Sequence, residues 1–218
     1  PTDFDDSIWP MLGWLIGDLS PNKIPLVTGL EMTSPSDDDL KALCAAFGTT
    51  SAAPMLHING HTPGKVYSIP SKLKNFNITK KHLAKLWNKF NYADSRVDLV
   101  AIGSPHASLT ECQSFVKFFN GKNCNPNVKT IITIGRDILS KAKSEGLVEQ
   151  LTSAGVQIIS DICWCSITEP ILPPEASVIM TNSGKYAHYA HGLTGRKTRF
   201  GSLKAVSYTH LTLPTNGT

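Results

Sequence analysis

Short apolar runs alternate with stretches of helical periodicity along most of the chain, and this alternation constrains the fold more than any other feature. The expected strands cover residues 24–30, 53–59, 97–103, 128–135, 156–160 and 177–181. The expected helices cover residues 7–19, 37–47, 79–91, 108–119 and 137–153, the last as one helix or a pair. Regular alternation of this kind favours a mostly parallel sheet with helices on both faces. The expected fold class is therefore α/β.

Composition and charge exclude several classes of protein. Hydrophobic residues make up 41% and charged residues 17% of the 218 residues, which is typical of a folded globular chain. The net charge is +4, but the basic residues are mostly lysine and no basic stripe is interleaved with aromatics, so nucleic acid is not an expected partner. No apolar run approaches the roughly 18 residues of a membrane span, so no membrane association is expected. Five cysteines, an odd number without paired spacing, favour a cytoplasmic protein over a secreted disulfide scaffold.

The two ends of the chain differ in charge. Eight of the 17 acidic residues precede residue 40, and none follows Glu175. The basic residues beyond that point are Lys185, Arg196, Lys197, Arg199 and Lys204. We expect this part of the molecule to attract anions.

The loop after the third expected strand contains Ser104, Pro105, His106 and Ser108. Ser108 precedes Glu111 by three residues, the spacing of a capping box at the start of a helix. His106 is not needed for the cap. A histidine at the carboxyl end of a strand can orient a bound anion or serve as an ordinary hydrogen-bonded residue, and the sequence leaves both open.

The last two expected strands are also followed by unusual loops. Cys163 and Cys165 form a CxC pair that suits an iron–sulfur or zinc site, although composition alone favours the alternative of buried structural cysteines. The last loop contains Asn182, Ser183, Lys185 and His188 around a glycine. Hydrogen-bond donors and a lysine at the start of a helix suggest an anion-binding cradle. Motifs for dinucleotide-binding, P-loop, α/β-hydrolase and zincin chemistry do not occur.

Three motifs taken together, GSPHASLTE, SDICW and TNSGKYAHY, resemble the signatures of the aconitase X family. The resemblance extends from near residue 7 to about 205, covers about the second half of the family's large catalytic subunit, and implies a partial aconitase-like three-layer architecture. It also implies a lyase, an iron–sulfur-dependent dehydratase. The expected substrate is a small hydroxy acid anion such as mevalonate 5-phosphate or cis-3-hydroxy-L-proline.

The resemblance also assigns residues to a site. Cys163 matches the family's cluster ligand. The expected substrate-binding residues are Ser104, Pro105, His106, Ser108, Asn182, Ser183, Lys185 and His188. The catalytic base is expected to lie outside this chain, in a swivelling small domain or subunit, so the chain alone is expected to be inactive. Where the family usually has AHYAPG, this sequence has His191-Gly192, which removes a fixed proline φ.

Residues 206–218 depart from the family pattern and resemble translated sequencing adapter, so we expect an artefactual or unstructured tail after a catalytic region at 1–205. A different class of function also stays open: a non-catalytic α/β module in which the cradle binds an anion and Cys163 is a core residue.

Overall fold

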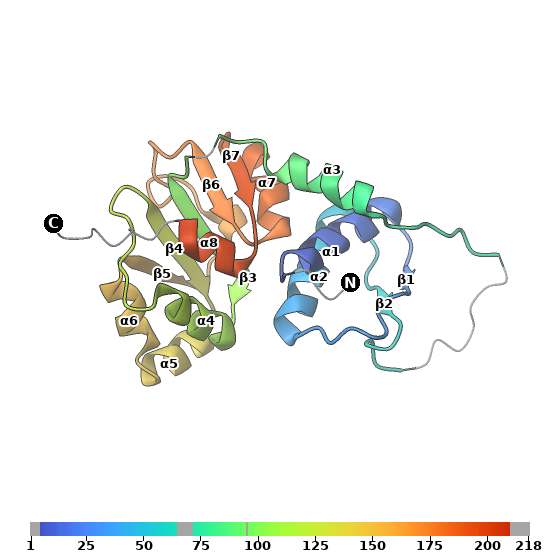
Figure 1. Ribbon diagram of the computed structural model, residues 1–218, viewed down its shortest axis with the longest axis horizontal. Helices are drawn as coiled ribbons and strands as arrows, with labels where there is room; N and C mark the ends of the chain where they lie inside the picture. The colour runs from blue at the N-terminus through green and yellow to red at the C-terminus, as the bar shows by residue number, and fades with distance from the viewer. Residues whose placement is uncertain (1–4, 65–71, 95, 210–218) are drawn as a thin grey trace.

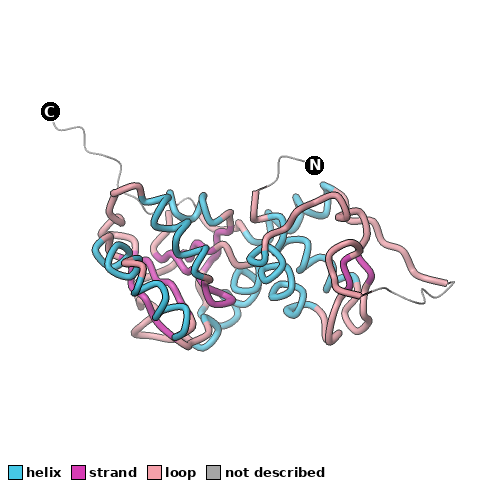
Figure 2. Tube along the Cα trace, turned by 90° about the horizontal axis from the view of Figure 1, so that it is seen from below, coloured by secondary structure: helices cyan, strands magenta, loops and turns pink. Residues whose placement is uncertain are grey.

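The computed structural model describes residues 5–64, 72–94 and 96–209, which form two lobes that pack side by side (Figure 1). The first lobe is mainly helical and ends with a helix that reaches across to the second lobe. The second lobe contains a five-stranded sheet wrapped by helices. A separate pair of very short strands lies at the far end of the first lobe from that sheet (Figure 2).

The first lobe is built on two helices in very close contact. Its elements are α1 (Ile8–Leu19), β1 (Leu26–Val27), α2 (Asp37–Thr50), β2 (His57–Ile58) and α3 (Lys80–Phe90). Gly13 of α1 packs against α2 so closely that an added Cβ would lie 2.0 Å from the carbonyl oxygen of Leu43. A backbone atom cannot move aside as a flexible side chain can, so glycine at this position sets the spacing of the two helices.

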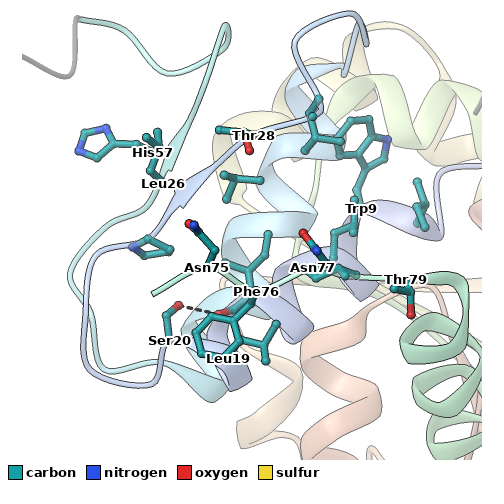
Figure 3. Close-up of a pocket in the computed structure, with 18 of the residues that line it drawn as sticks. Trp9, Leu19, Ser20, Leu26, Thr28, His57, Asn75, Phe76, Asn77 and Thr79 are labelled. Atoms are coloured by element: carbon teal, nitrogen blue, oxygen red, sulfur yellow. Dashed lines mark hydrogen bonds between the residues drawn. The ribbon is translucent and has the colours of Figure 1, made fainter. Parts of the chain in front are cut away.

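A wide groove runs between α1, the short strands and residues 72–79 of the first lobe (Figure 3). Trp9, Leu19, Leu26 and Phe76 are among the residues that line it. None of the residues that the sequence assigns to a site lines this groove. This groove is therefore separate from the expected site.

The second lobe is a doubly wound α/β unit. Its strands are β3 (Leu99–Ala107), β4 (Lys129–Ile134), β5 (Val156–Ser160), β6 (Val178–Thr181) and β7 (Lys197–Phe200). Its helices are α4 (Leu109–Phe119), α5 (Arg136–Ser144), α6 (Leu147–Ser153), α7 (Gly184–Thr194) and α8 (Leu203–Thr209), with a 3₁₀ turn at Trp164–Ser166. The strand order is β5-β4-β3-β6-β7, and all neighbouring pairs are parallel.

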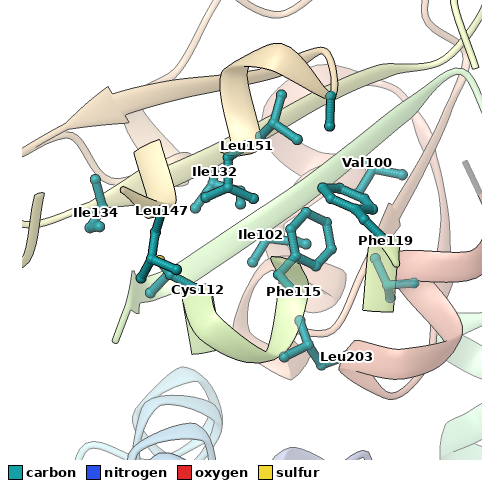
Figure 4. Packing of buried hydrophobic residues seen from close by; sticks show 14 of the residues in the cluster. Val100, Ile102, Cys112, Phe115, Phe119, Ile132, Ile134, Leu147, Leu151 and Leu203 are labelled. Atoms are coloured by element: carbon teal, nitrogen blue, oxygen red, sulfur yellow. The ribbon is translucent and has the colours of Figure 1, made fainter. Parts of the chain in front are cut away.

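Alternate residues of the strands face different hydrophobic clusters. Val100 and Ile102 of β3 pack with Phe115 and Phe119 of α4 on one face of the sheet (Figure 4). Leu99 and Ala101 pack on the other face, with Trp164 and Tyr186. This alternation is the period of two that a strand imposes on its side chains. Helices on both faces complete three layers, which confirms the expected α/β class.

The structure differs from the expected elements in two places. The expected strands at 24–30 and 53–59 are reduced to β1 and β2, which pair with each other and do not join the main sheet. Strand β7, at the edge of the main sheet, was not expected from the sequence. Its residues Lys197, Thr198, Arg199 and Phe200 carry two charges, so the segment lacks the apolar run that marked the other strands.

The expected boundary at residue 206 is also corrected by the structure. Val206 and Ser207 lie within α8 and are buried, Val206 against the cluster on the α4 face of the sheet. The first residues of the expected tail therefore pack against the second lobe. Residues 210–218 lie outside the described part of the chain, and the origin of the segment stays a prediction.

No helix in the described part of the chain is long and apolar enough to cross a membrane.

Candidate functional site

The three unusual segments lie at the carboxyl ends of strands of the main sheet. The first is the irregular last part of β3, and the other two follow β5 and β6. The chain winds from β3 to β4 and β5 in one direction, and then returns to place β6 on the opposite side of β3. The carboxyl ends of β3 and β6 therefore flank a topological switch point, where open α/β sheets bind their ligands. Ser104 lies in the last part of β3, beyond its pairing with β6, and Asn182 directly follows β6, so these sequence-predicted residues meet at the position where a site is expected.

Gly103 allows a sharp bend within β3. Its φ is +97°, and an added Cβ would lie 2.1 Å from the carbonyl oxygen of Thr133 on β4. The Thr133 hydroxyl donates a hydrogen bond of 2.6 Å to the Gly103 carbonyl oxygen and fixes this bend. The register between β3 and β4 shifts here, and the following Ser104–Pro105 peptide bond is cis. The bend places Ser104 in the interior, where its hydroxyl has no hydrogen-bond partner among the described residues.

Ser183 joins the loop after β6 to the bent last part of β3. Its hydroxyl accepts a hydrogen bond of 3.0 Å from the backbone N–H of Tyr186 and so caps α7. The same hydroxyl donates to the carbonyl oxygen of Ser104. Asn182 is half-buried beside the cap, and its side chain forms no hydrogen bond within the described residues. The two loops are thus held together, with the first turn of α7 between them.

Cys163 lies next to Lys185, the second residue of α7. The Lys185 Nζ donates to the Cys163 Sγ across 3.7 Å. Burial alone would raise the pKa of the Cys163 thiol, but a hydrogen bond from the backbone N–H of Cys165 and the charge of Lys185 lower it overall. Burial and the neighbouring Cys163 raise the pKa of Cys165 to about 11. The two cysteines of the CxC pair are therefore distinct, and Cys163 is the one that favours the thiolate.

His106 connects the bent last part of β3 to the loop of Cys163 and Cys165. Its Nε2 lies 2.9 Å from the carbonyl oxygen of Ile162, an acceptor, so Nε2 carries the proton of this contact. The backbone carbonyl of His106 in turn accepts from the Nζ of Lys41 on α2, at 3.3 Å. His106 therefore positions the residue just before Cys163, and Lys41 fixes the His106 backbone from the first lobe.

Ser108 has the predicted cap and one unpredicted partner. Its hydroxyl accepts from the backbone N–H of Glu111, while Glu111 accepts from the Ser108 N–H, which confirms the capping box. The hydroxyl also donates to Asp38 of α2 at 2.7 Å. The hydroxyl proton of Ser108 is thus engaged, and substrate binding by this residue stays a prediction.

Lys41 forms ion pairs with two carboxylates at the contact between the lobes. Its Nζ lies 2.7 Å from Asp38 and 2.5 Å from Glu111. We expect Lys41→Met to reduce the free energy of unfolding at pH 7 by about 2–3 kcal/mol, because it leaves two partly buried carboxylates without their counter-ion. Chemical denaturation monitored by circular dichroism measures this loss.

The loss of stability caused by Lys41→Met should grow with pH. Burial raises the pKa of Glu111, and Lys41 offsets part of that effect, so the pKa of Glu111 rises further in the variant. A carboxyl group with a raised pKa in the folded state binds more protons than in the unfolded chain, so stability falls as the pH rises through that window. The variant should therefore lose more stability at pH 8 than at pH 5. Combining Lys41→Met with Glu111→Gln should remove this pH dependence. An equal loss of stability at pH 5 and pH 8 in Lys41→Met alone would contradict the assignment of Glu111 as the titrating group.

His188 lies away from the loop contacts and against α1. Its Nδ1 is 3.0 Å from the indole Nε1 of Trp14, and it is half-buried. The basic residues after Glu175 are also dispersed. Arg196 bonds the Glu169 carboxylate and several backbone carbonyls, so it has a structural role. Among them, Lys185 is the one that lies at the first turn of α7 beside Cys163.

Two family models match the chain and account for nearly all of this architecture. Residues 2–88 match the Aconitase X second domain, and residues 97–211 match the Aconitase X third domain. The chain belongs to the aconitase X family. The two matched regions correspond to the two lobes, and the site lies in the third domain with Lys41 and Trp14 added from the second.

Curated aconitase X relatives are longer than this chain. Over 208 residues this chain is 40% identical to "Cis-3-hydroxy-L-proline dehydratase" of Hypocrea jecorina. The aligned region covers 92% of this chain and 35% of that protein. The corresponding protein of Pseudomonas aeruginosa is 38% identical, with 91% and 35% covered. "Phosphomevalonate dehydratase large subunit" of Methanocaldococcus jannaschii is 26% identical, with 92% and 49% covered. The chain thus spans about a third to a half of the length of these relatives.

A solved aconitase X structure has the same fold. The holo-form of Thermococcus kodakaraensis aconitase X superposes with a TM-score of 0.83 at 26% sequence identity. The match covers 94% of this chain and 52% of that one. Both lobes are therefore present in the solved structure.

Several residues that organise the site carried no signal in the aconitase X motifs. Lys41, Asp38 and Trp14 come from the second domain, more than sixty residues from their partners along the chain. No local pattern identifies such contacts. Trp164 is different, because a tryptophan between two cysteines at a strand end could have been noticed. Its ring is fully buried, and its indole N–H donates to the Ile102 carbonyl oxygen.

Proposed function

We propose that the full-length protein is an aconitase X-type dehydratase that removes water from a small hydroxy acid anion, and that this chain supplies the anion-binding cradle. The observation that carries the proposal is the Ser104 hydroxyl. It is buried, with the residue only 4% exposed, and it has no partner among the described residues. A buried hydroxyl without a partner is costly in a folded protein, so a bound group that hydrogen-bonds to it would repay that cost.

The surroundings of Ser104 favour a negatively charged group. Ser183 ties Ser104 to the amino-terminal end of α7, an 11-residue helix whose dipole and free N–H groups attract anions. The backbone N–H groups of Gly184 and Lys185 form no hydrogen bond within the described part of the chain. Lys185 forms no ion pair with a carboxylate there, and its Nζ contacts the Cys163 Sγ at the same end of α7. These donors suit a carboxylate.

The relatives favour cis-3-hydroxy-L-proline over mevalonate 5-phosphate as the substrate. The two cis-3-hydroxy-L-proline dehydratases are 40% and 38% identical to this chain, whereas the phosphomevalonate dehydratase large subunits are 24–29% identical.

The residues present fit one ligand of an iron–sulfur cluster. Cys163 favours the thiolate, receives an N–H hydrogen bond from Cys165 and lies at the end of a rigid strand, all of which suit a cluster ligand. No group of three His, Cys, Asp or Glu side chains in the described residues could hold a metal ion. We therefore assign Cys163 as this chain's contribution and the other ligands to the rest of the enzyme. When bound, the iron would act as a Lewis acid on the departing hydroxyl group.

The remaining machinery belongs to other parts of the full-length protein. No residue here is assigned as the base that takes the proton next to the carboxylate, and a small domain or subunit is its proposed source. This chain by itself is expected to show no turnover, because groups that act as a unit fail almost completely when one is missing.

The test uses the full-length protein purified without oxygen. We expect turnover of cis-3-hydroxy-L-proline and little or none of mevalonate 5-phosphate. Ser104→Ala should raise the KM by about 10-fold, because it removes one hydrogen bond to a charged substrate worth about 1.5 kcal/mol.

A matched control removes a buried hydroxyl elsewhere in the same sheet. Thr130 is fully buried near the amino end of β4, at the opposite edge from the site, and Thr130→Val should leave the KM unchanged. Binding of the anion without turnover would support a non-catalytic module and would overturn the proposal. Preferred turnover of mevalonate 5-phosphate would overturn the substrate assignment alone.

A further inference from the structure

The contact between Trp14 and His188 joins the second domain to the helix that begins at the cradle. Trp14 lies on α1 and is 7% exposed, and its indole Nε1 is 3.0 Å from the Nδ1 of His188 on α7. The two ring centroids are 5.9 Å apart. This is a specific side-chain hydrogen bond within a packed interface.

The chemistry of the indole decides the direction of this hydrogen bond. An indole N–H can only donate, so His188 must accept with an unprotonated Nδ1. The single proton of the neutral imidazole is then on Nε2. We propose that Trp14 is a positioning residue that holds His188 as the neutral tautomer with its proton on Nε2.

A third element supports the same state. The ammonium group of Lys89, in the last turn of α3, lies 4.3 Å from the centroid of the Trp14 ring. A cation over the ring draws electron density from the indole and makes its N–H a stronger donor. Burial lowers the pKa of His188, the charge of Lys89 lowers it further, and Asp18 of α1 acts in the opposite direction. The neutral imidazole is therefore favoured.

The tautomer determines what His188 can do, and this step rests on the proposed function. His188 is three residues after Lys185, so the two side chains lie on one side of α7. With its proton on Nε2 and its Nδ1 occupied, the ring offers a hydrogen-bond donor and no free basic nitrogen. His188 would then help bind an anionic group, and it would not take a proton from the substrate.

The experiment observes the ring directly in the 218-residue chain labelled with ¹⁵N in its histidine and tryptophan side chains. At pH 8, two-bond proton–nitrogen spectra should show a protonated Nε2 and an unprotonated Nδ1 for His188. Scalar coupling across the hydrogen bond should connect its Nδ1 to the Nε1 of Trp14. The signals that vanish in His188→Gln give the assignment.

The variants separate the hydrogen bond from general packing. Trp14→Phe keeps an aromatic ring and should abolish the coupling and introduce the tautomer with the proton on Nδ1. Lys89→Met should weaken the coupling without removing it. Trp87→Phe is the control, since Trp87 lies on the same helix as Lys89 with its ring against Phe200, and it should change none of the His188 signals.

Two results would overturn the proposal: a protonated Nδ1 in the wild-type chain, or unchanged His188 signals in a folded Trp14→Phe variant. The wild-type spectrum alone decides the matter if Trp14→Phe does not fold. A full-length protein without dehydratase activity would contradict the proposed function and leave these spectra unaffected, so the two failures are distinguishable.

Discussion

Full-length protein with serine in place of Cys163 is expected to lose its bound iron and, with it, more than 99% of its activity. The reason is the electrostatic setting of this cysteine. Lys185 and the N–H of Cys165 stabilise the thiolate, the form that binds iron. A serine hydroxyl has a much higher pKa than a thiol and is a poor substitute in a cluster.

Cys165→Ser is the matched control. The pKa of Cys165 is raised to about 11, which keeps its thiol protonated at neutral pH, so we expect this variant to retain its iron. Iron and acid-labile sulfide are measured in proteins purified without oxygen. Equal iron in Cys163→Ser and the unmodified protein would refute the ligand assignment, and loss of iron in both variants would show that the pair binds together.

Replacing Trp164 by alanine is expected to reduce the free energy of unfolding by about 3–5 kcal/mol. The Trp164 side chain is fully buried, and its ring centroid lies 5.1 Å from that of Tyr186 on α7. Its indole N–H donates to the Ile102 carbonyl oxygen at 2.7 Å. The substitution would leave both a large cavity and a carbonyl group without its donor. Denaturation of the purified chain by urea measures the loss.

Two further variants divide this effect into its parts. Trp164→Phe retains most of the ring but not the N–H, and should cost about 1–2 kcal/mol. Trp87→Ala, at an exposed tryptophan, should cost about 1 kcal/mol or less. A loss below about 1 kcal/mol for Trp164→Ala would show that the turn at Trp164–Ser166 does not depend on this side chain. In the full-length protein, Trp164→Ala should also lower the iron content, because Cys163 directly precedes the tryptophan.

The main sheet was predictable wherever a strand is buried on both faces. Such strands read as apolar runs, and β3, β4 and β6 lie close to their expected positions. The edge strand β5 was also predicted, because Val156, Ile158 and Ile159 make it apolar despite its position. Strand β7 was missed because an edge strand tolerates charged residues such as Lys197 and Arg199. The segments around β1 and β2 are apolar as well, but they pair with each other in the first lobe, and hydropathy alone does not reveal a strand's partner.

The site was predictable at the level of loops and much less at the level of individual contacts. The positions at strand ends and the family motifs identified the segments that contain Ser104, Cys163 and Ser183. The fold places the segments of Ser104 and Ser183 at the ends of neighbouring strands, and hydrogen bonds link the three segments. The CxC spacing itself did not distinguish Cys163 from Cys165, and only the family resemblance singled out Cys163 as the expected ligand. The difference in their pKa values arises in part from the position of Lys185 in space. Nothing in the sequence indicated that Lys41 and Trp14, from the other lobe, hold parts of the site.

A buried cluster crosses the boundary at which the family models divide the chain. Trp14 and Leu86, from the first lobe, pack in one cluster with Ala187 and Phe200 of the second. An apolar interface of this kind resists hinge motion far better than a polar one. The two aconitase X domains in this chain should therefore move as one rigid body.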